Sequence, residues 1–433
     1  MASGSMSLPK LNMVSYAFYL QLVLYSWVGS VLVVYNIDHH YSITNISDQS
    51  IRFYGWLSVM YTMVFVPIGI LISKLFFTKK ILLNYFDCFL QKKLETSLSE
   101  NDSYLKIYLY LLSFISLFTY VYLLFYIKEV GLYKMFTSAD PLKMLIFRID
   151  SSRNFQGNQY LINVFGLALT PVLAYISYGY YMISKSNNDK LWCVLMFLLS
   201  VLFLTYNLEK GPLITFVLGY VFVYVLINGG IKKRTLVYLS IILLVVLIVF
   251  YLFITNEVDI FKLFSYNSGI GGRILLSQLS GFYECLAIYP QQHDFLGFTS
   301  ISKPISNLVG IDFNERAARI NMMIIYPEAV KNGIVGVGNT LFIGEAWANF
   351  GLLGILLSPI YVGVWIGTIY NYIIIRSKKT PIVLGIYAYL SVFGSMTGGF
   401  NDYIYSPVLL IILMILYLIL SAGFTLKKYL NEY

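Results

Sequence analysis

Residues 235–255 read TLVYLSIILLVVLIVFYLFIT and carry no charged side chain. About 20 apolar residues in a helix, each rising about 1.5 Å, cross the hydrocarbon core of a bilayer. Three basic residues, Lys232-Lys233-Arg234, stand immediately before the run. A long apolar segment with basic residues at one end is typical of a transmembrane helix. This stretch therefore predicts an integral membrane protein.

The composition of the whole chain points the same way. Of its 433 residues, 58% are hydrophobic and 12% are charged, and the mean hydropathy is +0.72. A soluble globular chain carries about a quarter charged residues. We therefore expect an all-α, polytopic membrane protein that forms a single membrane domain over residues 1–433. Ten segments are long and apolar enough to cross the bilayer: 12–35, 54–77, 105–127, 161–184, 190–208, 212–229, 235–255, 340–372, 381–398 and 405–424.

The positions of the lysines predict how these segments are oriented. Every Lys-Lys pair falls on one side of the membrane if all ten segments cross it, and by the positive-inside rule that side is the cytoplasm. Both termini are then cytoplasmic, and the net charge of +9 reflects topology instead of binding to nucleic acid. The pairs are Lys79/Lys80, Lys92/Lys93, Lys232/Lys233, Lys378/Lys379 and Lys427/Lys428.

Two long loops are expected on the extracytoplasmic side. The larger, 256–338, joins the seventh and eighth crossings, and we expect it to contain short helices at the membrane surface. The smaller loop is 128–160. The cysteines fall in different compartments, so we expect no structural disulfide between any of Cys88, Cys193 and Cys285.

Arginine is distributed against the positive-inside rule. Six of the eight arginines lie outside: Arg52, Arg148, Arg153, Arg273, Arg316 and Arg319. The guanidinium group is the preferred bidentate ligand of phosphate and pyrophosphate. Arg316 and Arg319 share a helix face by spacing, and Arg273 follows two glycines at an expected helix start, so these three predict a site for a phosphate-bearing ligand. Arg148 and Arg153 are a secondary anion-binding pair. The alternative is that these arginines pair with outer acids or with lipid headgroups.

Four further residues are candidates for catalysis or binding. Lys210 stands beside Glu209 between two crossings, where a charged pair is costly unless it has partners, although it could also mark a tight hairpin. Glu345 at the outer end of the eighth crossing, and His293 and Asp294 in the large loop, are candidates for a general base. The structural alternatives are a helix anchor for Glu345 and a solvated loop for the other two. The weaker candidates are Glu284, Asp402 and Tyr283.

Several chemistries lack support in the sequence. It contains no Asp-x-Asp pair, no Walker loop, no His/Cys metal spacing and no Gly-x-Ser-x-Gly motif. We therefore expect no metal and no cofactor, and no ATP-driven transport by this chain alone.

Three stretches, together with the layout of crossings and one large outer loop, resemble a known family. In chain order they are Lys210-Gly-Pro-Leu-Ile; Gly272-Arg273-Ile-Leu with Phe282-Tyr283 and Tyr289-Pro290; and Arg316-Ala-Ala-Arg319 with Tyr326-Pro327, Asn339-Thr340 and Phe342-Ile-Gly-Glu345-Ala-Trp-Ala-Asn349-Phe-Gly351-Leu-Leu-Gly354. On these features the chain resembles the bacterial oligosaccharide repeat-unit polymerases, also called Wzy or O-antigen polymerases. The resemblance extends over nearly the whole chain.

This resemblance implies a GT-C-like fold and a metal-independent glycosyltransferase in the bacterial cytoplasmic (inner) membrane. Such an enzyme transfers a growing glycan from undecaprenyl pyrophosphate to the terminal sugar of a new lipid-linked repeat unit, on the extracytoplasmic side. Its partners are those lipid-linked oligosaccharides, the bilayer and a chain-length-regulating co-polymerase. Arg273, Arg316 and Arg319 would then hold pyrophosphate with help from Lys210.

Three other functions remain open at this point. A structural or regulatory partner of the synthesis machinery would not need the set of outer arginines. An O-antigen ligase-type transferase would share the donor but deliver the glycan to another acceptor. A lipid-linked oligosaccharide flippase or exporter would need a polar path to both sides, and exporters are often built from internal repeats. No clear repeat is present, and the polar residues concentrate outside.

Overall fold

The computed structural model describes residues 5–80, 83–95, 102–137, 141–152, 154–209, 211–255, 261, 264–331 and 338–431. Helices dominate, and these residues contain no β-strand. The expected all-α fold is confirmed. The three cysteines are free, as expected.

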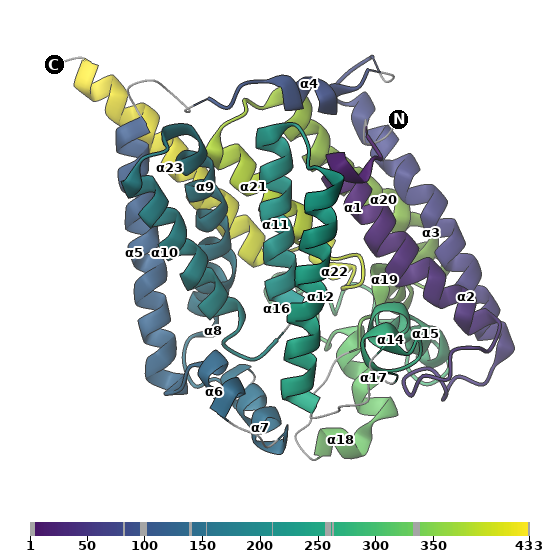
Figure 1. The fold of residues 1–433 in the computed structure, drawn as a ribbon. Coiled ribbons are helices and arrows are strands. Elements are labelled where there is room, and N and C mark those ends of the chain that lie inside the picture. The colour runs from purple at the N-terminus through teal and green to yellow at the C-terminus, as the bar shows by residue number, and fades with distance from the viewer. Residues whose placement is uncertain are drawn as a thin grey trace.

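Eight helices of the described chain are long and apolar enough, by length and composition, to cross a membrane. They stand side by side as a bundle (Figure 1). Each matches a predicted crossing. Together these helices indicate a multi-pass membrane protein. They are Met13–Val34, Gln49–Leu75, Leu105–Ile127, Gln159–Ser184, Asn187–Leu204, Gly211–Asn228, Leu352–Arg376 and Asn401–Ser421.

Several of these long helices combine shorter α- and π-helical stretches. The bounds, in chain order after the short η1 (Leu8–Lys10), are α1 (Met13–Tyr16), η2 (Ala17–Trp27), α2 (Val28–Val34), α3 (Gln49–Leu75), α5 (Asp102–Ile127), α8 (Gln159–Leu161), η3 (Ile162–Ala168), α9 (Leu169–Ser184), α10 (Asn187–Leu204), α11 (Gly211–Asn228), α20 (Leu352–Asn371), η4 (Tyr372–Arg376), α22 (Asn401–Ile404) and α23 (Pro407–Asn431).

The other two predicted crossings have different outcomes. The segment 235–255 lies within α12 (Lys233–Thr255), a helix of 23 residues, although the side chains near its end lie outside the described residues. The segment 381–398 contains α21 (Pro381–Val392), which has only 12 residues and is too short to cross as a straight helix. It ends before Gly394, whose φ is +64°, and the chain then forms a loop.

The predicted crossing 340–372 is wrong as a single helix. The chain forms α19 (Leu341–Phe350) and α20, separated at Gly351, whose φ of +59° lies in the region that favours glycine. A Cβ atom on Gly354 would stand 1.9 Å from the carbonyl oxygen of Ala346, so the two helices meet too closely for any side chain there. As a result, the first part of the apolar run forms the separate short helix α19.

The lysine-rich segments meet at one end of the bundle, together with α4 (Tyr85–Gln91). Lys10 pairs with Asp87 of α4 at 2.7 Å, and the ammonium group of Lys379 donates to the carbonyl oxygens of Leu90 and Lys92 at 2.9 Å. Both chain ends lie at this same end (Figure 1). These contacts bring the segments that carry Lys92 and Lys379 together at one end, which we call the inner end, and its cytoplasmic location stays a prediction.

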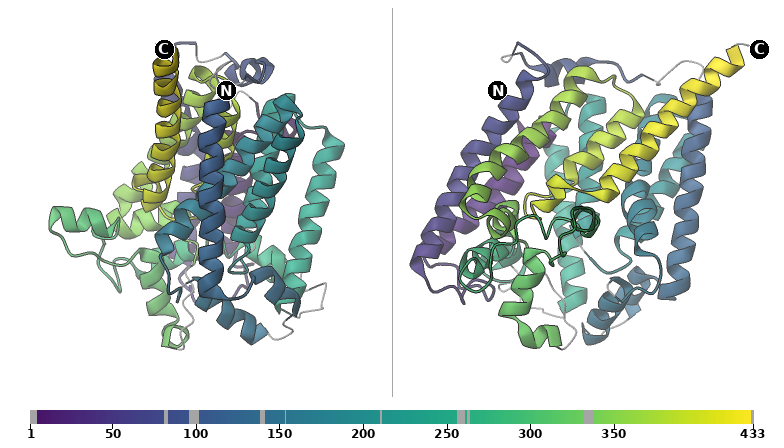
Figure 2. Two further views of the ribbon diagram at one scale, coloured as in Figure 1. Left: turned by 90° about the vertical axis from the view of Figure 1, so that its left-hand side faces the viewer. Right: turned by 180° about the vertical axis from the view of Figure 1, so that it is seen from behind.

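The opposite end, which we call the outer end, is built from short helices of the two predicted loops (Figure 1, Figure 2). One of them, α16, projects sideways from the bundle (Figure 2). Their bounds are α6 (Gly131–Thr137), α7 (Pro141–Ser152), α14 (Gly269–Leu275), α15 (Ser280–Ile288), α16 (Lys303–Val309), α17 (Ala317–Ile325) and α18 (Pro327–Lys331).

The outer helices are fixed to the bundle through close contacts with glycine. A Cβ atom on Gly55 of α3 would lie 2.3 Å from the ring of Tyr283, so α15 packs directly on the backbone of α3. A Cβ atom on Gly344 of α19 would lie 2.9 Å from the Cα atom of Phe282. The helix α15 is therefore held between α3 and α19.

Candidate functional site

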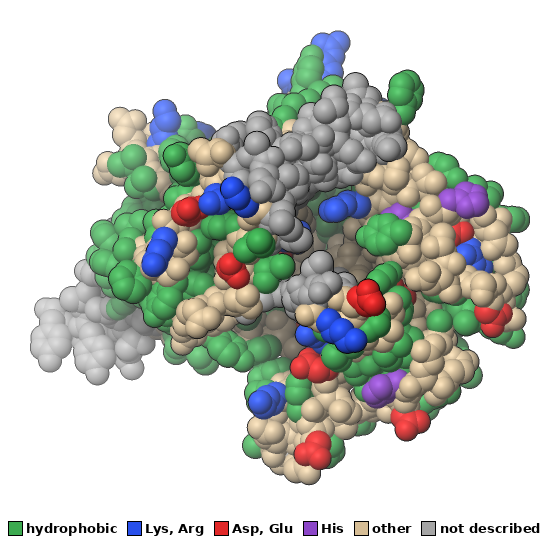
Figure 3. All heavy atoms as spheres, turned by 90° about the horizontal axis from the view of Figure 1, so that it is seen from below, with side chains coloured by type: hydrophobic (Ala, Val, Ile, Leu, Met, Phe, Trp, Pro, Cys, Tyr) green, Lys and Arg blue, Asp and Glu red, His purple; other side chains and the backbone are tan. Residues whose placement is uncertain are grey.

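A cavity of about 490 Å³ lies among the outer-end helices. The helices α7, α14, α15 and α17 contribute to its wall, and the lining includes Arg148, Arg273, Ser277, Glu284, Met322 and Tyr326. We call it the arginine cavity. Figure 3 shows the molecule from this end, where basic and acidic side chains are spread among apolar ones. Cavities of about 300–1,000 Å³ are typical of ligand-binding sites.

Arg273 lines this cavity, but its place in the helix differs from the prediction. The seven-residue α14 begins at Gly269, so Arg273 lies in its last turn and not at its start. Gly271 and Gly272 allow the helix to press against the preceding turn, because a Cβ atom would stand 2.2 Å and 2.6 Å from atoms of Ser265 and Asn267. In the described chain no acidic side chain pairs with Arg273.

Glu284 is the acidic residue of the arginine cavity. Its side chain comes from α15, where it follows Phe282 and Tyr283, and it is only 5% exposed. Burial raises the pKa of Glu284 from 4.5 to about 7, because the charged form loses its contact with water. No basic side chain of the described chain forms an ion pair with it. A buried carboxyl group that titrates near neutrality in a cavity is a candidate general base.

Tyr326, just past the end of α17, lies close to this carboxyl group. Its hydroxyl group is buried and has no hydrogen-bond partner in the described chain. Burial, followed by the charge of Glu284, raises the pKa of Tyr326 to about 12. The hydroxyl group is therefore a neutral donor, and it is available to a ligand oxygen in the cavity.

Arg148 completes the basic side of the cavity from α7. It forms a loose ion pair of 3.6 Å with Glu209, and both side chains are more than 40% exposed. Such an exposed pair contributes little to stability, because water screens it. Arg148 can therefore turn toward an anionic ligand at small cost.

Arg319 lies in α17, three residues before Met322. Unlike Met322, it does not line the arginine cavity. One of its guanidinium nitrogens, Nη1, is buried and has no hydrogen-bond partner in the described chain. An unsatisfied buried donor is costly, so this nitrogen is a ready site for an acceptor. The spacing of three places Arg319 and Met322 on one side of α17.

Arg316 and Glu345, which the sequence predicts as ligand-binding and catalytic residues, form an ion pair with each other. Arg316 donates from Nε to Oε1 of Glu345 at 2.8 Å and from Nη2 to Oε2 at 2.9 Å, and from Nη1 to Asp402 at 2.9 Å. The backbone N–H of Asn401 donates to Oε2 of Glu345 at 2.8 Å. Glu345 is 1% exposed. Its carboxylate is thus occupied by the protein, as the anchor interpretation expected.

The polar residues next to this pair form a buried network. Ser300 donates to Oδ1 of Asn349 at 2.8 Å, and Asn349 donates to Oδ1 of Asn401 at 2.9 Å. Asn401 in turn donates to the carbonyl oxygen of Ser300 at 2.9 Å. The network connects the large outer loop, α19 and α22, and each link is satisfied within the protein, so its role is to fix these elements.

Arg52 is also occupied within the protein. It pairs with Asp38 at 2.7 Å, and the two side chains are 7% and 3% exposed. It also donates to the carbonyl oxygens of Val33 and Ile46. Among the outer arginines of the described chain, Arg52 and Arg316 each donate from all three guanidinium nitrogens to groups of the protein, whereas Arg148, Arg273 and Arg319 keep more of their donors for a ligand.

The remaining predicted residues lie elsewhere. His293 packs against the ring of Tyr289 at 5.5 Å between centroids, and its Nδ1 shares a hydrogen bond of 2.8 Å with the backbone oxygen of Asp294. Neither residue belongs to the lining of the arginine cavity. Lys210 and Arg153 lie outside the described residues. The described chain contains no cluster of three or more His, Cys, Asp or Glu side chains.

Sequence reasoning ranked Glu284 low and gave Tyr326 no role. One signal was available, because Glu284 is the single charged residue in the apolar run Gly281-Phe-Tyr-Glu-Cys-Leu-Ala-Ile. A lone carboxyl group in such a run is either buried or directed into a cavity. For Tyr326 the sequence offers no comparable signal.

A comparison of the chain with family models, with curated proteins and with solved structures gives no match.

Proposed function

We propose that the chain is a polysaccharide polymerase of the Wzy type with a GT-C-like fold. In this proposal it joins lipid-linked oligosaccharide repeat units in the bacterial cytoplasmic membrane. The observation that carries the proposal is the arginine cavity, which brings Arg148 and Arg273 together with the buried carboxyl group of Glu284. We place the cavity on the extracytoplasmic side, because the lysine-rich segments lie at the other end.

The reaction needs a base and a site for a leaving pyrophosphate. The acceptor hydroxyl oxygen attacks the anomeric carbon of the donor sugar, the bond from that carbon to the pyrophosphate oxygen breaks, and undecaprenyl pyrophosphate leaves. Glu284, when deprotonated, takes the hydroxyl proton. A group with a pKa near the working pH is suited to this task.

The arginines act on the leaving group. Arg273 and Arg148 reach the cavity from two helices, and their guanidinium groups can hold two phosphate units as negative charge develops on them. Arg319, with its unsatisfied Nη1, would support them. The expected help from Lys210 falls on a residue outside the described part of the chain. This assignment gives the base role to Glu284 instead of Glu345, because the carboxylate of Glu345 already accepts three hydrogen bonds.

An apolar groove gives the lipid tail a place beside the cavity. The groove has a volume of about 580 Å³ and lies between α3, α15, α19 and α20, with Leu57, Leu286 and Leu356 among its lining. Leu286 and Glu284 are two residues apart in α15, so they point to nearly opposite sides of that helix. A polyprenyl chain in the groove would therefore stand one helix away from the proposed base.

The test is a gene deletion in the host, complemented by variants and read as a gel of surface glycans. Wild type should restore the ladder of polymer, whereas Arg273→Ala and Glu284→Gln should give a single repeat unit. Arg376→Ala and Glu328→Gln are matched controls, since both side chains are exposed and neither lines the cavity. The amount of each variant in the membrane is measured in parallel.

Three results would overturn the proposal. A full ladder with both Arg273→Ala and Glu284→Gln removes the site. A full ladder left on its lipid carrier in the deletion strain indicates a ligase. Repeat units trapped on the cytoplasmic leaflet indicate a flippase or exporter.

A further inference from the structure

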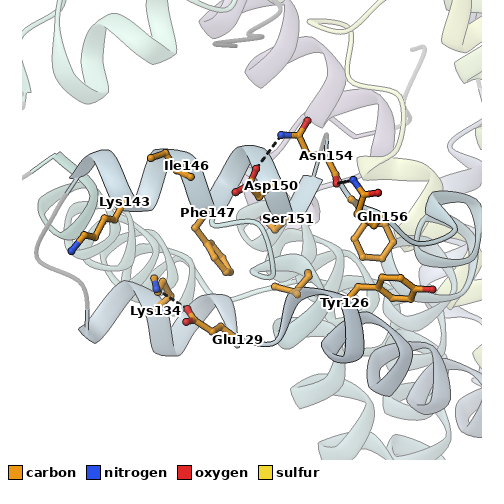
Figure 4. Close-up of a pocket in the computed structure, with 12 residues that line it drawn as sticks. Tyr126, Glu129, Lys134, Lys143, Ile146, Phe147, Asp150, Ser151, Asn154 and Gln156 are labelled. Atoms are coloured by element: carbon orange, nitrogen blue, oxygen red, sulfur yellow. Dashed lines mark hydrogen bonds and ion pairs between the residues drawn. The ribbon is translucent and has the colours of Figure 1, made fainter. Parts of the chain in front are cut away.

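A second outer cavity, of about 740 Å³, lies between the end of α5, α6 and α7 (Figure 4). Its lining combines aromatic side chains with amides and charged groups, among them Tyr126, Phe147, Asp150, Asn154, Phe155 and Gln156. Figure 4 shows Phe147 of α7 directed toward α6, with Asp150, Asn154 and Gln156 following one another along the wall. None of these six residues lines the arginine cavity. We call this space the aromatic cavity.

The charges of the described residues that line the aromatic cavity cancel. Lys134 pairs with Glu129 at 2.7 Å within the wall, and Lys143 and Asp150 carry opposite signs. The lining residues that the structure describes therefore offer no excess of positive charge to a phosphate group, in contrast to those of the arginine cavity. A ligand that fits here is polar but has little net charge.

The aromatic side chains provide flat apolar surfaces. The rings of Tyr126 and Phe155 stand 5.5 Å apart at 61°, and Tyr122 packs on Tyr126 at 5.0 Å. Such pairs are rigid and keep part of each ring face accessible to a ligand. Tyr126 is 38% exposed.

Planar polar groups stand beside these rings. Asn154 donates to the carboxylate of Asp150 at 3.0 Å, and Gln156 donates to the backbone oxygen of Asn154 at 2.9 Å. Each amide keeps further donor and acceptor positions, and the carboxylate keeps further acceptor positions. Aromatic faces next to amide and carboxylate groups suit a sugar ring, which has an apolar C–H face and hydroxyl groups at its edge.

The helix α7 separates the aromatic cavity from the arginine cavity. Phe147 and Asp150 lie on the side that faces the aromatic cavity, whereas Arg148 lines the other. Neighbouring residues of a helix point about 100° apart, so one helix can present side chains to both spaces. A ligand with its anionic end at Arg148 needs only to pass around one helix to reach the second cavity.

From this arrangement we infer that the aromatic cavity binds uncharged sugar residues of a glycan. Because Arg148 belongs to the proposed pyrophosphate site, these are the sugars of the lipid-linked chain beyond the one that reacts. That assignment to the lipid-linked chain rests on the proposed function, whereas the binding of an uncharged oligosaccharide does not.

The test measures binding of a soluble oligosaccharide to the full chain in lipid nanodiscs. The probe is the oligosaccharide of one to three repeat units that mild acid releases from the surface polysaccharide of the host, observed by saturation-transfer NMR. Binding to wild type should be detected and should weaken at least tenfold in Phe155→Ala and in Asp150→Asn. Glu328→Gln is the matched control and should bind the probe as wild type does, because Glu328 is exposed and lines neither cavity.

Two precautions make the result decisive. Phe155→Tyr keeps the ring and should keep the binding, and Gln156→Ala, an exposed position, should weaken binding even if Phe155→Ala fails to fold. Binding that is unchanged in Phe155→Ala, Asp150→Asn and Gln156→Ala would overturn the inference, as would a wild-type chain that does not bind the probe. If Arg273→Ala retains polymer synthesis while Phe155→Ala loses probe binding, the proposed reaction site fails and the glycan site stands.

Discussion

Arg316 and Glu345 form a bidentate ion pair, with distances of 2.8 Å and 2.9 Å, between the residue that precedes α17 and the interior of α19. The side chain of Glu345 is 1% exposed and that of Arg316 is 38% exposed. Two parallel hydrogen bonds between a guanidinium and a carboxylate fix both distance and orientation. The pair therefore sets where α17, and with it Met322 and Tyr326, stands against the bundle.

Replacing Arg316 with alanine should destabilise the protein more than it impairs the reaction itself. The change leaves the buried carboxylate of Glu345 without its main partner, which costs about 3–5 kcal/mol for a fully buried pair. Because Arg316 is partly exposed, we expect a loss of about 2–4 kcal/mol in the free energy of unfolding. Thermal unfolding of the purified protein in detergent measures it.

The double variant Arg316→Met/Glu345→Gln is the control for this pair. It removes both charges at once, so it should recover part of the stability that Arg316→Ala loses. A Glu345→Gln variant with wild-type stability but no activity would contradict this interpretation and would return Glu345 to the role of general base.

The rate of polymerisation should depend on the charge of Glu284. Its raised pKa of about 7 means that the carboxylate form, which accepts a proton, becomes the major form only as the pH rises above 7. The initial rate should therefore increase from pH 5 to pH 8 and then level off. We expect Glu284→Gln to lower the rate by about 10²–10⁴-fold at pH 8 and by less at pH 5, where Glu284 of the wild type is itself mostly protonated. Assays in proteoliposomes with a buffered interior measure both effects. A rate in wild type that is constant from pH 5 to pH 8 would exclude Glu284 as the base.

The outer arginines should divide into two groups by their effects. Arg52→Ala breaks a buried pair with Asp38 and should lower the melting temperature, with a loss of about 3–5 kcal/mol in the free energy of unfolding. Arg273→Ala removes an exposed side chain with no ion-pair partner in the described chain, so the melting temperature should stay as in wild type while activity falls. Thermal unfolding and the glycan gel on the same preparations separate the groups. Equal destabilisation by both changes would contradict the division.

The orientation can be tested with the exposed thiol of Cys88 in α4 at the inner end. In a variant with Cys193→Ser and Cys285→Ser, a membrane-impermeant maleimide should label Cys88 only after the cells are lysed. The matched reporter is Asp312→Cys in a chain without other cysteines, at an exposed position of the large outer loop, which should be labelled on intact spheroplasts. The opposite pattern would invert the topology and move the arginine cavity to the cytoplasm.

The sequence alone predicts those helices whose formation depends only on a long apolar run. Each of the eight long apolar helices follows from a run of residues with little charge, because a lipid environment leaves the backbone no other partner than itself. The break at Gly351 was not visible, since that glycine lies in a run as apolar as any crossing. Its positive φ and the contact between Gly354 and Ala346 depend on packing that only the folded chain creates.

A phosphate-binding and catalytic site on the outer side stays a prediction, and the structure adds which of the candidate residues lie together. The sequence indicated arginines and a base on the outer side, and the structure brings Arg148, Arg273 and Glu284 to one cavity. It could not show that Arg316 is already occupied, because its partners Glu345 and Asp402 lie 29 and 86 residues away along the chain. Only the closure of the large loop decides which arginines remain for a ligand.

The length of the short helix α21 determines where the loop that contacts α19 and Glu345 is placed. Its 12 residues rise about 18 Å, so the chain turns back well before the length of about 30 Å that a full crossing needs. The loop after it accepts hydrogen bonds from the first N–H groups of α19, at Met396 and Thr397, and leads to Asn401 beside Glu345. One added turn in α21 would carry these acceptors about 5 Å along the helix axis and out of register with α19. The constraint on α21 is therefore one of length, because a helix one turn longer would separate the loop from α19.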